Sequence, residues 1–137
     1  MEDYLSLLLT DVRAGRLRMR RLVSLLCETP ARILGLYPEK GALLPGSSAD
    51  LVIVDPDRPV RPSDDVLESK SAWTAYAGWD LIGAPVLTML RGVVIAEEGK
   101  VIADPGYGKY VAGRPQRWAE VAPGASQGLS LEPRDGS

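Results

Sequence analysis

The side chains best suited to chemistry in this sequence are three aspartates around one short apolar run. Asp50 precedes residues 51–54, and Asp55 and Asp57 follow them. Paired carboxylates can act as acid and base or bind a hard cation. Aspartate beside proline also hydrogen-bonds the local backbone, and these two flank Pro56. We therefore expect turn residues rather than a catalytic pair.

Other candidate groups also have structural explanations. Asp64 and Asp65 follow a Pro-Ser pair and are typical of turn or helix-capping positions. Residues 106–110 contain two glycines and a lysine but lack the spacing of a phosphate-binding loop. An aromatic cluster could form a ligand surface, although such residues most often close a core or an interface. The cluster consists of Trp73, Tyr76 and Trp79.

The chain contains no histidine and a single cysteine, Cys27. Without imidazole, neither a Ser-His nor a Cys-His nucleophile system can be assembled. Cys27 falls on the apolar stripe of an expected helix, so we predict a packed, inert thiol. A lone cysteine cannot form an intramolecular disulfide, which fits a reducing, cytoplasmic location.

Five arginines form a basic cluster near the N-terminus, and they are Arg13, Arg16, Arg18, Arg20 and Arg21. They could meet phosphates or an acidic partner. However, no aromatic residues are interleaved with them, and the whole chain carries a net charge of -2. We expect a solvated helix face. The sequence therefore predicts no nucleic-acid partner. It predicts no membrane partner either, because no apolar run approaches the roughly 18 residues of a spanning helix.

The first third of the chain is predicted to be helical. One apolar stripe consists of Leu5, Leu8, Leu9 and Val12, and a second of Met19, Leu22, Val23, Leu26 and Cys27. Asp3 is a possible cap for the first helix, and Gly15 ends it. Thr29 is expected to cap a third, short helix with Pro30 at its first position and Gly35 past its end.

From residue 41 onward, short apolar runs alternate with turn residues, which predicts strands. Pro45 and Gly46 suit a type II turn. Residues 51–54 are expected to form a strand buried on both faces and stopped at Asp55. Residues 86–96 and 100–103 should form a hairpin around 97–99, with Gly92 marking a bulge. After residue 111 the chain becomes rich in proline and glycine, which indicates a mobile tail or one ordered by a neighbour.

Several separated segments together resemble the C-terminal end of cyclic amidohydrolases, in the dihydroorotase, hydantoinase and allantoinase group. They are residues 30–41, 43–57, 67–78, 86–94 and 106–110. The resemblance covers about residues 3–110, and it departs at Ala75, where such proteins usually carry proline. It implies an α+β fold, with terminal helices of a TIM-type barrel at 1–40, part of a small β-sandwich at 41–112 and a tail at 113–137.

Enzymes of this group hold zinc or a similar divalent metal with histidines, an aspartate and often a carboxylated lysine. The histidine-free chain therefore has no predicted catalytic, cofactor-binding or metal-binding residue of its own. Three hypotheses follow: an inactive C-terminal segment of such a hydrolase, a non-catalytic oligomerisation module derived from the fold, or one half of a split enzyme. The first predicts a marginal fold, the second a stable, specific oligomer without activity, and the third activity restored by metal and a barrel-containing chain. The expected partner is a second copy of this chain or a barrel-containing chain.

Overall fold

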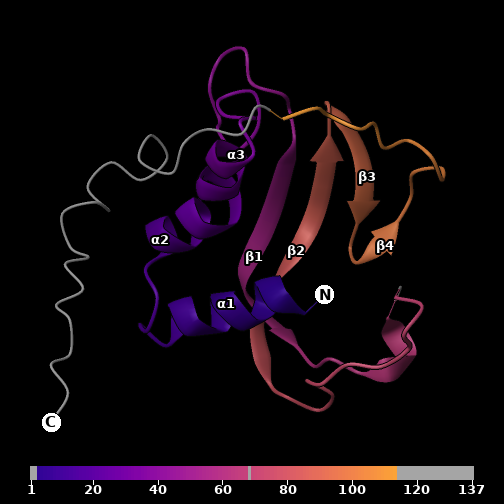
Figure 1. Ribbon diagram of the computed structural model, residues 1–137. Coiled ribbons are helices and arrows are strands. Elements are labelled where there is room, and N and C mark those ends of the chain that lie inside the picture. Colours follow the sequence, from indigo (N-terminus) through magenta and orange to yellow (C-terminus); the bar gives the residue numbers. More distant parts are fainter. Residues whose placement is uncertain (1–2, 68, 114–137) are drawn as a thin grey trace, which may run out of the picture.

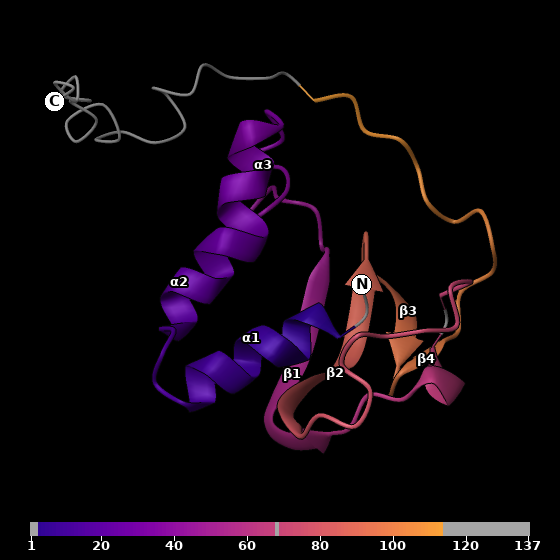
Figure 2. The ribbon, with the colours of Figure 1, turned by 60° about the horizontal axis from the view of Figure 1, so that its bottom comes forward.

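The computed structural model describes residues 3–67 and 69–113 and shows an α+β arrangement (Figure 1). Helices come first along the chain and an antiparallel sheet follows, in the order β1-β2-β3-β4. Both views place the helices beside β1 and β2, while β3 and β4 lie farther from them (Figures 1 and 2). The predicted α+β class is therefore confirmed.

The first helix, α1 (Tyr4–Arg13), forms where the leucine stripe predicts it. Its buried residues are Ser6 and Leu9. Asp3 was expected to cap this helix, but its side chain makes no capping hydrogen bond and its own backbone is helical. The carboxylate instead accepts a hydrogen bond from the Thr74 hydroxyl at 2.6 Å, because that distant loop lies against the helix N-terminus.

The next three helical elements form one continuous run, namely α2 (Met19–Val23), the π-helix η1 (Ser24–Glu28) and α3 (Thr29–Ile33). The prediction that Thr29 caps the third helix was wrong, since Thr29 has helical dihedral angles and the start of α3 has no side-chain capping hydrogen bond. Pro30 therefore lies inside the run, where a proline normally clashes with the carbonyl four residues earlier. That carbonyl belongs to Leu26, inside the wider π turn, which explains the toleration. Gly35 ends the run at φ +66°, as expected.

Strand β1 (Leu51–Val60) is longer and more exposed than predicted. It continues past Asp55 through two prolines, because a bulge between Asp55 and Pro59 offsets the pairing with β2 (Leu81–Leu90). It is also not buried on both faces, since Val52 and Ile53 are 52% and 55% exposed. β1 is one of the two edge strands of the described sheet, and edge positions and bulges are where strands accept proline.

Two tight turns close the remaining hairpins. Arg91 and Gly92 join β2 to β3 (Val93–Glu97), both with positive φ, so Gly92 belongs to a turn and the predicted bulge was wrong. Two residues with positive φ are what a type I′ turn requires. The predicted turn at 97–99 is confirmed, with Glu98 and Gly99 leading into β4 (Lys100–Val101). The type II turn at Pro45 and Gly46 is confirmed as well, because Ser47 N–H donates to the Leu44 carbonyl at 3.0 Å.

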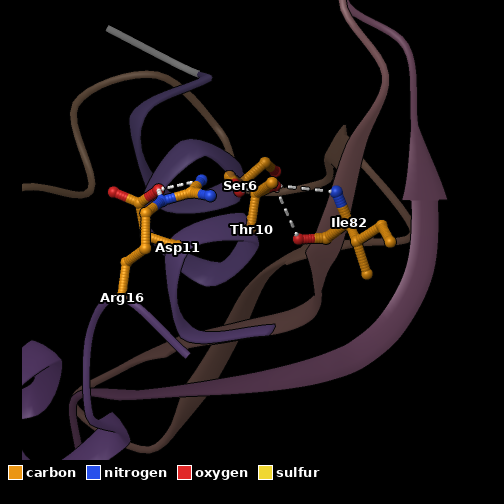
Figure 3. A network of polar contacts seen from close by, with 5 residues as sticks. All are labelled: Ser6, Thr10, Asp11, Arg16 and Ile82. Carbon is orange, nitrogen blue, oxygen red and sulfur yellow. Dashed lines mark hydrogen bonds and ion pairs between the residues drawn. The ribbon is translucent and has the colours of Figure 1, made fainter. Parts of the chain in front are cut away.

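Helix α1 and strand β2 approach each other closely. Gly83 lies against Leu9, so a β-carbon placed on the glycine would lie 2.6 Å from that of Leu9. At the next residue of the helix, the Thr10 hydroxyl accepts the Ile82 N–H at 2.9 Å and lies 3.3 Å from the Ile82 carbonyl (Figure 3). A helix side chain thus satisfies backbone groups of the kind that another strand would normally pair.

The chain after β4 runs past the end of the sheet toward α3, as both ribbon views show (Figures 1 and 2). Midway, the Arg91 guanidinium donates to the Tyr107 carbonyl at 2.7 Å and stacks over the Tyr107 ring at 4.5 Å. At its end, Gly113 lies directly against the Leu34 carbonyl. The predicted tail lies almost wholly outside the described residues, which end at position 113.

Candidate functional site

Asp50 is the most highly connected of the candidate carboxylates. It accepts hydrogen bonds from the Lys40 ammonium and, at 2.8 Å, from the Arg91 N–H. The Ala49 carbonyl beside it accepts the Gly92 N–H at 3.0 Å. Asp50 therefore joins the loop after α3 to the β2–β3 turn. This role is structural, as the turn interpretation predicts, but the hydrogen bonds join residues farther apart in the sequence than those of a local turn.

The charges around Asp50 set its titration. Partial burial acts to raise its pKa, but the hydrogen bonds from Lys40 and Arg91, together with their positive charges, outweigh burial and lower the pKa. A carboxylate with a lowered pKa in the folded state contributes stability above its unfolded pKa of about 3.9. That contribution is lost as the pH falls through the lower, folded value.

Asp50→Asn should therefore reduce the free energy of unfolding at neutral pH by roughly 1 to 3 kcal/mol, because an acceptor of charge-assisted bonds is lost. The deficit relative to wild type should shrink as the pH falls below about 4, because the unfolded carboxylate then becomes protonated, and it should vanish as the pH falls through the lower pKa of the folded carboxylate. Urea unfolding of both proteins between pH 3 and pH 7 measures this difference. Asp104→Asn, at an exposed position, is the control. A deficit that stays constant with pH would contradict the assignment.

The other aspartates serve local structure or surface pairing. Asp55 accepts the Asp57 N–H at 3.0 Å, which is the proline-flanking turn bond predicted for this pair. Asp57 forms an ion pair with Arg13 on the surface. Asp64 begins the short 3-10 helix η2 (Asp64–Val66) and accepts the Thr74 N–H at 2.9 Å. None of these contacts arranges two carboxylates as an acid and base pair.

The structure leaves the basic cluster on the surface. Arg13 pairs with Asp57, and Arg16 pairs with Asp11 at 2.6 Å. Each of the five arginines is exposed. Such surface ion pairs add little stability, so the solvated-face interpretation remains the simplest.

The prediction of a packed thiol at Cys27 was wrong, because Cys27 is exposed. It lies in the π-helix η1, where the widened turn rotates side chains away from the regular helical stripe. Nearby atoms still remove part of the thiol from water, which raises its pKa. A raised pKa lowers the thiolate fraction, so the thiol has little nucleophilic character.

The aromatic cluster borders a hollow in the surface of about 240 Å³. Trp73 and Tyr76 line it, whereas Trp79 does not and instead packs edge-on against Tyr76 at a centroid distance of 5.4 Å. The N-terminus of α1 supplies the opposite wall through Asp3 and Tyr4. Ala75, the position that departs from the family pattern, is also in the lining.

No group of three or more histidine, cysteine, aspartate or glutamate side chains suited to a metal ion occurs within residues 3–67 and 69–113. The same ranges contain no helix long and apolar enough to cross a membrane. The donors that a catalytic zinc requires are thus not assembled by the described part of this chain. Its side chains mainly join helices, loops and sheet to one another.

The fold defines an α+β protein whose helices pack beside an antiparallel meander. Residues 3–95 match the amidohydrolase family, and the chain belongs to that family. It is 43% identical to the L-hydantoinase of Paenarthrobacter aurescens over 115 residues, which are 83% of this chain and 25% of that protein. It is 36% identical to the dihydroorotase of Methanothermobacter thermautotrophicus over 111 residues, or 81% of this chain and 25% of that protein.

A solved structure shows the same arrangement of elements. The L-hydantoinase (dihydropyrimidinase) from Arthrobacter aurescens superposes with a TM-score of 0.76 at 43% identity, over 79% of this chain and 24% of that one. The chain therefore spans about a quarter of the length of the curated relatives it matches. The resemblance to cyclic amidohydrolases that the sequence indicated is confirmed.

Proposed function

We propose that this chain works as the C-terminal part of a metal-dependent cyclic amidohydrolase and is inactive alone. Its relatives include a hydantoinase and a dihydroorotase, and it matches about a quarter of each. In this proposal, helices α1 to α3 are the terminal helices of a TIM-type barrel and the sheet is part of a small β-sandwich. The metal and the residues that hold it belong to the remaining three quarters.

The observation that carries this proposal is the number of large apolar side chains exposed on the helices and the loop after them. They are Met19, Val23, Leu25, Ile33, Leu34, Leu43 and Leu44. Leu43 is 80% exposed and Leu34 is 55% exposed. Leaving such surface in water costs about 25 cal/mol per Å², so a covering partner is favoured. A barrel, whose strands need helices packed against their outward face, is a suitable cover.

In the assembled enzyme, metal-activated water would attack the carbonyl of a cyclic amide and open the ring at the C–N bond. The contribution of this chain is to hold the terminal helices and the sheet at a fixed separation. The α1–β2 contact and the Asp50 bonds provide that rigidity. The substrate among hydantoins, dihydropyrimidines and dihydroorotate would be selected by barrel loops. A cytoplasmic location accompanies this proposal.

The test combines this chain with the upstream three quarters of the Paenarthrobacter aurescens L-hydantoinase, in the presence of zinc. We expect no hydrolysis of hydantoin or dihydroorotate by either part alone, a stable complex of the two parts, and ring opening by that complex. Leu25→Glu should weaken the complex, whereas Arg20→Glu at a polar exposed position should not. Ring opening by the chain alone, or failure of the parts to associate, would contradict the proposal.

A second candidate function is a non-catalytic assembly module. The exposed apolar side chains and the edge strand β1, with Val52 and Ile53 more than half exposed, favour it. Unpaired sheet edges promote pairing between copies. This function predicts a homo-oligomer of defined size in light scattering, with no activity after any complement is added. The first function predicts that the barrel part displaces self-association.

A further inference from the structure

The hollow beside the N-terminus of α1 combines aromatic walls with a carboxylate. Its lining contains three aromatic residues, Tyr4, Trp73 and Tyr76, and the acidic residue Asp3. Trp73 and Tyr4 are 66% and 41% exposed, so their surfaces remain accessible to a ligand. None of the lining residues in the described part of the chain is a lysine or an arginine.

Thr74 holds the acidic side of the hollow in place. This residue is only 7% exposed. Its hydroxyl donates to Asp3 Oδ2 at 2.6 Å, and its N–H donates to Asp64 Oδ1 at 2.9 Å. Two carboxylates are thereby fixed on one buried threonine. Within the described ranges, neither carboxylate forms an ion pair with lysine or arginine, so their negative charge is not neutralised locally.

The N-terminus of α1 lies at the same place and contributes about half a positive charge. Asp3 in the lining, with Asp64 behind Thr74, exceeds that charge, so the hollow attracts cations. Aromatic faces also attract cations through their quadrupoles, and cages of aromatic rings recognise quaternary ammonium groups in this manner. Inorganic divalent ions fit less well, because they require several oxygen ligands rather than ring faces.

We propose that this hollow binds a small organic cation that carries a methylated ammonium group. The ammonium would lie against the rings of Trp73 and Tyr76, with Asp3 as its counter-charge. A volume of about 240 Å³ accommodates a headgroup such as choline. The lining includes neither the residues of the α1–β2 contact nor Asp50 and its partners, which join the helices to the sheet.

The experiment titrates the 137-residue chain with choline chloride and, separately, with 3,3-dimethyl-1-butanol, the uncharged isostere of choline. Sodium chloride keeps the ionic strength constant. The Trp73 indole N–H signal, identified by its absence in Trp73→Phe, reports binding by NMR. We expect saturation at millimolar choline and at least ten-fold weaker binding of the isostere. Equal binding of both compounds, or a signal that never saturates, would overturn the proposal.

Substitutions then locate the site. Binding in the variants is followed by isothermal titration calorimetry, which needs no tryptophan signal. Trp73→Ala should lose binding at least ten-fold, Trp73→Phe should keep most of it because a ring remains, and Asp3→Asn should weaken it about five- to ten-fold. Asp104→Asn and Tyr110→Ala, at exposed positions outside the lining, are the matched controls and should bind as wild type does. Equal losses in the controls would refute the location.

Discussion

Replacing Gly83 by alanine is expected to lower the free energy of unfolding by about 3 kcal/mol, because two costs combine. The backbone at Gly83 has φ +98°, where a residue with a β-carbon is strained by about 1 to 3 kcal/mol. The new methyl group would also lie 2.6 Å from the Leu9 β-carbon and 2.8 Å from Cδ1. Moving α1 away from β2 to relieve this clash lowers the free energy of unfolding by about a further 1 to 3 kcal/mol.

Urea unfolding followed by circular dichroism measures the effect as a fall in midpoint of about 1 to 3 M. Gly46→Ala is the matched control. Gly46 has a similar φ of +92° but no atom within 4 Å of an added β-carbon, so it reports backbone strain alone. The Gly83 variant should lose more than the control. Equal losses would show that the close approach of α1 to β2 contributes nothing.

Leu22→Ala should destabilise the chain by about 3 kcal/mol, since Leu22 is 5% exposed and truncation leaves a cavity among packed atoms. Leu25→Ala makes the same chemical change three residues later, where the leucine is 39% exposed. In the isolated chain, Leu25→Ala should lower the free energy of unfolding by less than about 1 kcal/mol. Thermal or urea unfolding of the two variants gives the comparison directly.

The same pair should behave differently once the barrel part is bound. If that part covers the exposed helix face, Leu25→Ala should weaken the complex by roughly ten-fold, a cost that corresponds to about 1.4 kcal/mol. Leu22→Ala should act mainly on the stability of the chain itself. A complex whose affinity is unchanged by Leu25→Ala would place the barrel elsewhere.

Local sequence rules succeeded where a single turn or helix decides the outcome. The leucine stripe predicted α1, and Pro45 with Gly46 predicted the type II turn. These rules failed where pairing with a distant strand decides the local structure. Pro56 reads as the end of a strand, but the bulge opposite β2 lets β1 continue, and no signal near Pro56 announces that partner. The turn at Arg91 and Gly92 was not predicted, because the apolar run around these residues looks continuous in the sequence.

The candidate site was less predictable than the fold for the same reason. The aromatic cluster was visible in the sequence, but its opposite wall comes from Asp3 and Tyr4, about 70 positions earlier. Thr74 carried no signal that distinguished it from other polar loop residues. Likewise, Asp50 was recognised as a turn residue, whereas its partners Lys40 and Arg91 became visible only once the chain had folded.

The hydrogen bond between Thr10 and Ile82 joins residues 72 positions apart, and this separation constrains the order of events during synthesis. Ribosomes add about 5 to 20 residues per second, so α1 emerges roughly 4 to 14 seconds before its strand partner exists. During that interval the apolar stripe of the helix has no β2 surface to cover it. The early chain is consequently the stage at which a chaperone, or an already folded barrel, would protect it most.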